Sequence, residues 1–488
     1  MSNEITSVTV RMYNTGSVGD CLLFLFNRKD KTTFKMLIDC GGWNADTPTI
    51  TSCAADIQTA TGGQLDLLVV THQHEDHVSG FNQARAIFDK ISAKEVWMSW
   101  IEDSSDEIGR ILKEKYGKKL KQLKAAAQRA EKELKTESNK KYKVRGFGQR
   151  LSAKANSMAD TIKLIEFEEG LNLGKGLASG KRTNDDAMEY VRNKTTNIHY
   201  RKPGDVVQIP GAEGIKFFIL GPPRDADMKF FKIATKEEEM YHLAANTEKE
   251  ETQIKPDNAI LTAGILLEDL VSPFNAQYRL NKDQKNEFMK AYNSKDVRWR
   301  QIETDWLESS ASLALRVTSL TNNTSLAMAI EFTASEKVML LPADAQSGNW
   351  MSWHKPDVMK DLKLKGGKDT VELLKNTVFY KVGHHGSHNG TASLSGLDLI
   401  NSADLVAMMP LVQDKVPKEW GGADNFPAKA LYNVLIDKTK GRIIRTDEGI
   451  VKSARAKKLR DLLSTADLKR FNASFDDGPC YKEFTLKV

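Results

Sequence analysis

The stretch THQHEDHVSG, residues 71–80, concentrates a third of the nine histidines of this 488-residue chain. It follows LDLLVV, an apolar run typical of a buried strand. Its polar residues are His72, His74, Asp76 and His77. At this spacing the first two can converge on one cation and the last two on a second, and imidazole with carboxylate suits zinc, manganese or iron. Since such groups are costly to bury without a partner, we expect a metal-binding loop.

A site for two cations needs further ligands from distant parts of the chain, and two other expected strands end in suitable residues. VMLLPADAQ ends its apolar run at Asp344. VFYKVGHHGSHNG ends another run at His384 and His385, with His388 just beyond. Asp344 in isolation is typical of a turn or a helix cap, but the repeated design of a strand followed by histidines indicates shared ligation.

Composition sets broad limits on the class of protein. Hydrophobic residues make up 40% of the chain, and the net charge of +6 is compatible with polyanionic partners. The four cysteines show no paired spacing, which fits a reducing compartment better than a disulfide framework. The N-terminal sequence lacks a signal-peptide layout, and no apolar run approaches the roughly 20 residues that cross a bilayer. We therefore expect a cytoplasmic protein with no membrane partner.

Several further motifs accompany the histidine clusters. They are NTGSVGDCLLF, MLIDCGG, LTNNTSLAMAIEF followed by VMLLPADA, KVGHHGSHNG and GRIIRTDEG. With THQHEDHVSGF, they resemble the metallo-β-lactamase fold superfamily, and more closely the soluble hydrolase domain of the ComEC-like DNA-uptake proteins and its free-standing relatives. The likeness covers roughly residues 7–101, 204–223 and 311–451.

The resemblance implies an α/β fold, a four-layer αββα sandwich with helical insertions and two divalent metal ions, zinc or manganese, at one edge. Under it, His72 and His74 hold the first ion, and Asp76 and His77 the second. Asp344 bridges the two ions. His384 or His385 completes the second site, and we prefer His384 because it lies nearer the strand.

Three other residues receive supporting roles from the same resemblance. Asp39 matches an aspartate that orients a ligand imidazole from behind. His388 and Ser387 are candidates for substrate contact or for protonating the leaving group.

The sequence departs from the superfamily pattern in two places. Most members carry a further histidine before the bridging aspartate, whereas here that stretch offers only His199 and His242, in or beside insertions. The ComEC-like group resembles this chain in that absence, which leaves the first ion with fewer ligands. Ala343 stands where glycine is usual, which is tolerable if the turn needs no positive φ.

The expected organisation interleaves the fold with insertions. Its parts are the first half of the fold (1–102), a lysine-rich helical insertion (103–200), return strands (201–223), a second polar insertion (224–305) and the second half of the fold (306–488). The lysine-rich segment is either a solvated helix or a basic arm that contacts a phosphate backbone.

The expected function is metal-dependent hydrolysis, most simply by a phosphodiesterase or nuclease that cleaves DNA or RNA with a water activated between two cations. Asp76 would accept the proton or steady the nucleophile. One alternative is a small-molecule hydrolase acting on a lactone, thioester or cyclic nucleotide. Another is an effector subunit of a bacterial defence system, activated by a protein partner that the insertions would bind.

Overall fold

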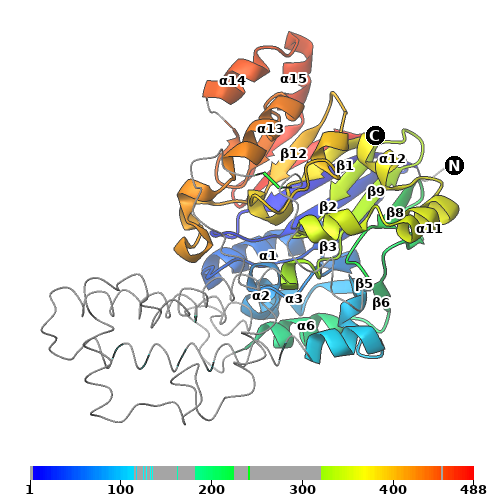
Figure 1. Cartoon of the computed structure of the whole chain (residues 1–488), viewed down its shortest axis with the longest axis vertical. Coiled ribbons are helices and arrows are strands. Elements are labelled where there is room, and N and C mark those ends of the chain that lie inside the picture. Colours follow the sequence, from blue (N-terminus) through cyan, green and yellow to red (C-terminus); the bar gives the residue numbers. More distant parts are fainter. Residues whose placement is uncertain are drawn as a thin grey trace, which may run out of the picture. The chain divides into compact units, whose positions relative to one another are not determined.

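The computed structural model describes residues 4–114, 182–224, 240–241, 320–451 and 454–488, with a few single positions between 117 and 162. The chain divides into two compact units. Unit 1 comprises Met1–Arg110, Phe167–Asn246 and Ser319–Val488, and unit 2 comprises Ile111–Glu166 and Thr247–Thr318. All elements named below belong to unit 1 (Figure 1). Most of the lysine-rich segment and of the second polar insertion lies outside the described residues.

The first sheet has eight strands in the order β15-β16-β1-β2-β3-β4-β5-β6. Their bounds are β1 (Ile5–Tyr13), β2 (Leu22–Arg28), β3 (Thr33–Ile38), β4 (Gln64–Val69), β5 (Ser92–Ser99), β6 (Ile198–Arg201), β15 (Phe475–Asp477) and β16 (Tyr481–Lys487). The strands from β3 to β6 run parallel, and the others pair antiparallel. Parallel neighbours require crossover connections, and α1 (Thr47–Thr61) lies in that from β3 to β4, and α2 (Glu75–Gln83) and α3 (Arg85–Phe88) in that from β4 to β5.

The second sheet also has eight strands, in the order β14-β13-β12-β11-β10-β9-β8-β7. Their bounds are β7 (Val206–Val207), β8 (Ile215–Ile219), β9 (Met328–Phe332), β10 (Val338–Leu341), β11 (Thr377–Lys381), β12 (Val406–Met409), β13 (Ile443–Arg445) and β14 (Gly449–Ile450). The strands from β10 to β13 are parallel. This sheet is accompanied by α10 (Ser347–Ser352), α11 (Pro356–Gly366), α12 (Thr370–Lys375) and α13 (Lys429–Thr439). Helices α14 (Ala454–Arg460) and α15 (Thr465–Ala473) precede β15.

Three buried clusters show that the elements form four layers. Alternate residues of both sheets, such as Phe24 and Ile330, share one core between the sheets. The opposite face of the first sheet packs on α1, α2, α3 and α6 (Asn184–Arg192). The opposite face of the second sheet packs on α10 to α13. In Figure 1, α1 and α2 lie on one side of the strands, and α12 and α13 lie on the other.

The described residues within 182–201 join the first half of the fold. Helix α6 lies in the cluster behind the first sheet, and β6 is the edge strand beside β5. The sequence had assigned this stretch to the lysine-rich insertion. In the described part of the chain, no helix combines the length and apolarity needed to cross a membrane.

The polar loops of the expected site each follow the end of a strand. β4 leads into residues 70–77, β10 into Ala343 and Asp344, and β11 into the short turn Gly383–Gly386. The parallel neighbours β10 and β11 end at the same edge of the second sheet. The loop after β4, in the first sheet, ends beside them, since His77, Asp344 and His385 lie in one cluster.

Candidate metal centre

His77 is oriented from behind by Asp39. The Asp39 Oδ2 atom accepts a hydrogen bond from His77 Nδ1 at 2.8 Å, and Asp39 also accepts from the Thr71 amide at 2.8 Å and the Thr71 hydroxyl at 2.6 Å. With Nδ1 committed to Asp39, the other ring nitrogen, Nε2, faces Asp344 and lies 3.2 Å from its Oδ2. Asp39 therefore holds the ring from its Nδ1 side, opposite to the nitrogen that faces Asp344.

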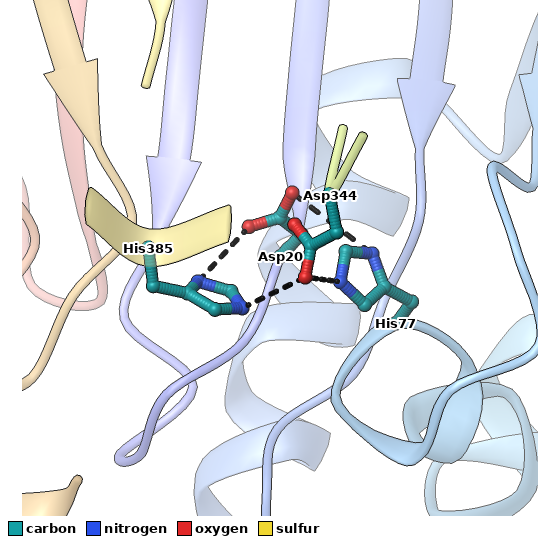
Figure 2. Close-up of side chains that lie close together, drawn as sticks. All are labelled: Asp20, His77, Asp344 and His385. Atoms are coloured by element: carbon teal, nitrogen blue, oxygen red, sulfur yellow. Dashed lines mark ion pairs between the residues drawn. The ribbon is translucent and has the colours of Figure 1, made fainter. Parts of the chain in front are cut away.

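His385 is held in the same way from the opposite side. Its Nδ1 donates to the Pro410 carbonyl at 2.8 Å, which turns Nε2 towards the carboxylates. That Nε2 lies 3.0 Å from Asp76 Oδ2 and 3.5 Å from Asp344 Oδ2. Figure 2 shows Asp344 reached by one nitrogen of His385 and one of His77. Donor residues from two other loops, His77 after β4 and His385 after β11, therefore face Asp344.

His384 lies differently from its neighbour. Its Nε2 accepts from the Asn322 amide at 3.2 Å, and its Nδ1 is 2.7 Å from Ser387 Oγ. Since the Ser387 hydroxyl donates to Asn389 Oδ1 at 3.0 Å, it accepts from the His384 ring. Both ring nitrogens are thus engaged, and the geometry favours His385, not the preferred His384, as the ligand.

His72 and His74 bring two ring nitrogens together. His72 Nε2 lies 3.0 Å from His74 Nδ1. The Thr71 hydroxyl donates to Asp39, so its oxygen accepts from His72 Nδ1, 3.1 Å away. His72 Nε2 is then the acceptor in the hydrogen bond between the two rings. A cation between these nitrogens would satisfy both of them.

Buried donor atoms without hydrogen-bond partners indicate what the site is built to hold. Within the described part of the chain, Asp76 Oδ1, His77 Nε2 and Asp344 Oδ2 are buried and make no hydrogen bond. Native proteins rarely leave such atoms unpaired unless an ion or water completes them. The residues therefore fit divalent cations. His72 and His74 would hold one, Asp76, His77 and His385 the other, and Asp344 both.

The close packing of charged groups shifts the pKa values of the histidines in the site. Burial alone would lower the pKa of His77, but the nearby carboxylates, Asp344 first, outweigh it and hold that pKa well above its usual value. The same balance, again led by Asp344 against burial, raises the pKa of His385 to about 10. Conversely, burial lowers the pKa of His384 to about 4, so this ring is neutral at physiological pH. The two histidines that face Asp344 thus carry protons that a bound cation would displace.

Two residues of the site were missed by the sequence analysis. Asp20 lies close to His77, Asp344 and His385 and forms with them a cluster of potential metal ligands. Lys381, the last residue of β11, pairs with Asp20. The signals were present, since Asp20 ends the quoted motif NTGSVGD and Lys381 stands three residues before His384.

Other expected residues lie apart from the cluster. His388 is exposed, and its carbonyl oxygen accepts from the Tyr241 amide at 3.1 Å. His199 lies on β6, with its ring 2.9 Å from Asn197 Oδ1. His242 is outside the described residues. The described chain therefore offers the first cation His72, His74 and Asp344.

The turn before Asp344 corrects one expectation. Ala343 has φ +53°, so the turn does need the left-handed conformation that glycine adopts most easily. Its carbonyl accepts from the His384 amide at 3.2 Å and from Lys381 Nζ at 3.1 Å. These contacts hold a strained backbone where it presents Asp344, a common property of functional sites.

Comparison with known proteins agrees with this architecture. The family model of the metallo-beta-lactamase superfamily matches residues 18–96, which run from the turn before β2 through α2 into β5. The two sheets with their helices agree with the expected αββα sandwich. This superfamily consists largely of hydrolases, and the Asp-His cluster fits their use of divalent metals. The match does not extend to the ComEC-like group. Neither curated proteins nor solved structures give a significant match.

Glu75 should make the metal-free protein sensitive to pH. Its carboxyl is buried at the start of α2, where Oε1 accepts from the Asn44 amide at 3.1 Å, and burial raises its pKa to about 8. A carboxyl with a raised pKa stabilises the fold at low pH and loses that contribution as the pH rises from about 4.5 to 8. At pH 9 the chelator-treated Glu75→Gln variant should therefore be more stable than the wild type by roughly 3–5 kcal/mol, at about 1.4 kcal/mol per pKa unit.

Chemical denaturation at pH 5 and pH 9 measures this difference. At pH 5 the two proteins should be nearly equal in stability, because Glu75 is still protonated when folded. A stability difference that stays constant between the two pH values would contradict a neutral buried carboxyl.

Proposed function

We propose that the protein is a metal-dependent phosphodiesterase, most specifically a nuclease acting on DNA or RNA. The observation that carries the proposal is the convergence of unpaired, buried histidine and aspartate donors around Asp344. Divalent cations at these donors would supply Lewis-acid activation of a phosphoryl oxygen and of water. That chemistry suits hydrolysis of a phosphodiester.

The residues of the chain would share the remaining tasks. Asp76 retains a buried oxygen, Oδ1, that makes no hydrogen bond with any described residue, and this oxygen would orient the attacking water or accept its proton. Ser387, fixed between His384 and Asn389, lies at the rim of the same turn. His388 is exposed beside it and is the candidate for protonating the leaving oxygen.

Charge near the site supports an anionic, polymeric substrate. Helix α13 begins at the His385 turn, where the Ala428 amide donates to the Gly386 carbonyl at 2.8 Å. From there, residues 429–470 contain twelve lysines and arginines against five aspartates and glutamates. This net charge of +7 exceeds that of the whole chain, +6. A basic segment that begins beside a hydrolytic site favours a phosphate backbone, and the ComEC-like resemblance points in the same direction.

Incubation with plasmid, single-stranded DNA and single-stranded RNA, each with manganese or zinc, tests the proposal. The wild type should cleave at least one of these, and Asp76→Ala and His74→Ala should abolish cleavage. His199→Ala is the matched control because its ring lies on β6, outside the cluster, and it should retain activity. Intact nucleic acid under every metal, with turnover of a nitrophenyl phosphate or a lactone, would instead identify a small-molecule hydrolase.

A further inference from the structure

A lysine is buried directly behind the candidate metal ligands. The Lys381 side chain is 2% exposed. Its ammonium pairs with the Asp20 carboxylate, donates to the Ala343 carbonyl at 3.1 Å and lies 3.4 Å from Asp344 Oδ1. Burial disfavours the charge, but Asp20 and then Asp344 outweigh it and raise the pKa of Lys381. Lys381 thus lies at the base of the site, between the carboxylates of Asp20 and Asp344.

Asp20 faces the backs of the ligand rings, although it lies close to them. Its oxygens are 3.6 Å from His385 Nδ1 and 3.9 Å from His77 Nδ1. Those nitrogens already donate to the Pro410 carbonyl and to Asp39. Figure 2 shows Asp20 reached by the ring nitrogens that do not contact Asp344. The Nε2 atoms that a cation would use point away from Asp20, so its position suits an anchor better than a ligand.

The backbone holds Asp20 rigidly in this place. Its amide donates to the Asp76 carbonyl at 2.9 Å, and its carbonyl accepts from the Gly41 amide at 3.0 Å. Gly19 permits this close approach, because a Cβ there would lie 2.4 Å from the Gly41 carbonyl oxygen. The first strand turn and the histidine loop are thus joined behind the site.

The two oxygens of Asp344 are divided between different partners. Oδ1 faces Lys381, whereas Oδ2 lies 3.2 Å from His77 Nε2 and 3.5 Å from His385 Nε2. Without the ammonium, the carboxylate would be free to rotate and offer either oxygen. The ion pair therefore affects which oxygen of Asp344 is available for metal binding, in addition to stabilising the fold.

We infer that Lys381, anchored by Asp20, is a positioning residue that fixes Asp344 so that only Oδ2 is presented to bound cations. This inference rests on the metal site of the proposed function and assigns roles to two residues outside the expected ligand set. It also assigns Asp20 to the support of Lys381 and not to metal ligation.

Zinc binding to the chelator-stripped full chain tests the inference without recourse to activity. The key variant is Asp20→Asn combined with Lys381→Met, which removes the ion pair at constant net charge. Affinity is measured by titration with Zn²⁺ against a chromophoric chelator, and coordination by the visible spectrum of the Co²⁺-loaded protein. We expect Zn²⁺ affinity to fall about 10- to 100-fold, the usual cost of losing a residue that supports a ligand, and the Co²⁺ spectrum to change.

Two further variants make the result specific. Glu331→Gln combined with Lys368→Met neutralises a lysine–glutamate pair, 2.6 Å apart and outside the site, and should bind Zn²⁺ as the wild type does. Asp20→Asn alone weakens the anchor but keeps an oxygen for Lys381, so it should lower the Zn²⁺ affinity less than the double variant does, and it remains informative if the double variant does not fold.

Different outcomes would overturn the positioning role of Lys381 and the proposed metal-dependent function. Unchanged or tighter Zn²⁺ binding in the Asp20/Lys381 double variant, with an unchanged Co²⁺ spectrum, would overturn the positioning role. Loss of Zn²⁺ in Asp20→Asn alone, to the extent seen in Asp344→Asn, would show that Asp20 is itself a ligand and would also overturn it. A wild type that binds no Zn²⁺ would instead overturn the proposed function.

Discussion

Replacing Asp344 by asparagine is expected to lower the rate of hydrolysis by about a thousandfold, the equivalent of several kcal/mol of lost transition-state stabilisation. The Oδ2 atom of Asp344 lies 3.2 Å from His77 Nε2 and 3.5 Å from His385 Nε2, so it is placed to be shared between the ligand sets. Asparagine preserves the volume but removes the negative charge that two cations would share. Steady-state hydrolysis and zinc content, measured on the same preparation, should fall together.

A matched control separates this effect from a general loss of charge. Asp361 lies on α11 and pairs only with the exposed Lys365 among the described ion pairs. Asp361→Asn should leave both activity and zinc content unchanged. If Asp344→Asn retained most of its activity with a full complement of zinc, Asp344 would not be a shared ligand.

The second large effect is a contrast between adjacent histidines. His385→Ala should lower activity by about a hundredfold or more and release the cation held with Asp76 and His77, since a ligand is worth at least as much as the residues that support it. His384→Ala should retain its zinc, because that ring faces Asn322 and Ser387. Elemental analysis of both variants after dialysis against Zn²⁺ measures the contrast.

The reverse pattern would refute the orientation of this turn. If His384→Ala lost zinc and His385→Ala kept it, the His384 ring would be the ligand, and the hydrogen bond from His385 to Pro410 would have only a structural role.

The local part of the site was predictable from sequence because its ligands are close together in the chain. His72, His74, Asp76 and His77 lie on one strand end and the following helix start, where spacing alone determines proximity. Asp344 could also be predicted as a ligand, since it follows the end of a strand in a parallel set.

The choice between His384 and His385 was not predictable, because it depends on backbone angles. Both residues have positive φ, +44° and +50°, within a turn that rotates neighbouring side chains to different sides. Proximity to the strand favoured His384, whereas the turn brings His385 to Asp344. The same kind of rotation at Ala343 was not visible in the sequence, because alanine seldom marks a left-handed turn.

Asp20 and Lys381 escaped notice for a different reason. Neither has a spacing characteristic of metal ligands, and their pairing joins positions 361 residues apart. Such a buried ion pair becomes visible only when the strand ends of both sheets are brought to one rim.

The central claim is that these loops converge on divalent cations, and an anomalous-difference map from zinc-soaked crystals tests it most directly. We expect anomalous peaks at two positions, one between His72, His74 and Asp344 and one between Asp76, His77, His385 and Asp344. A map without density at these donors, or with zinc bound only elsewhere, would contradict it.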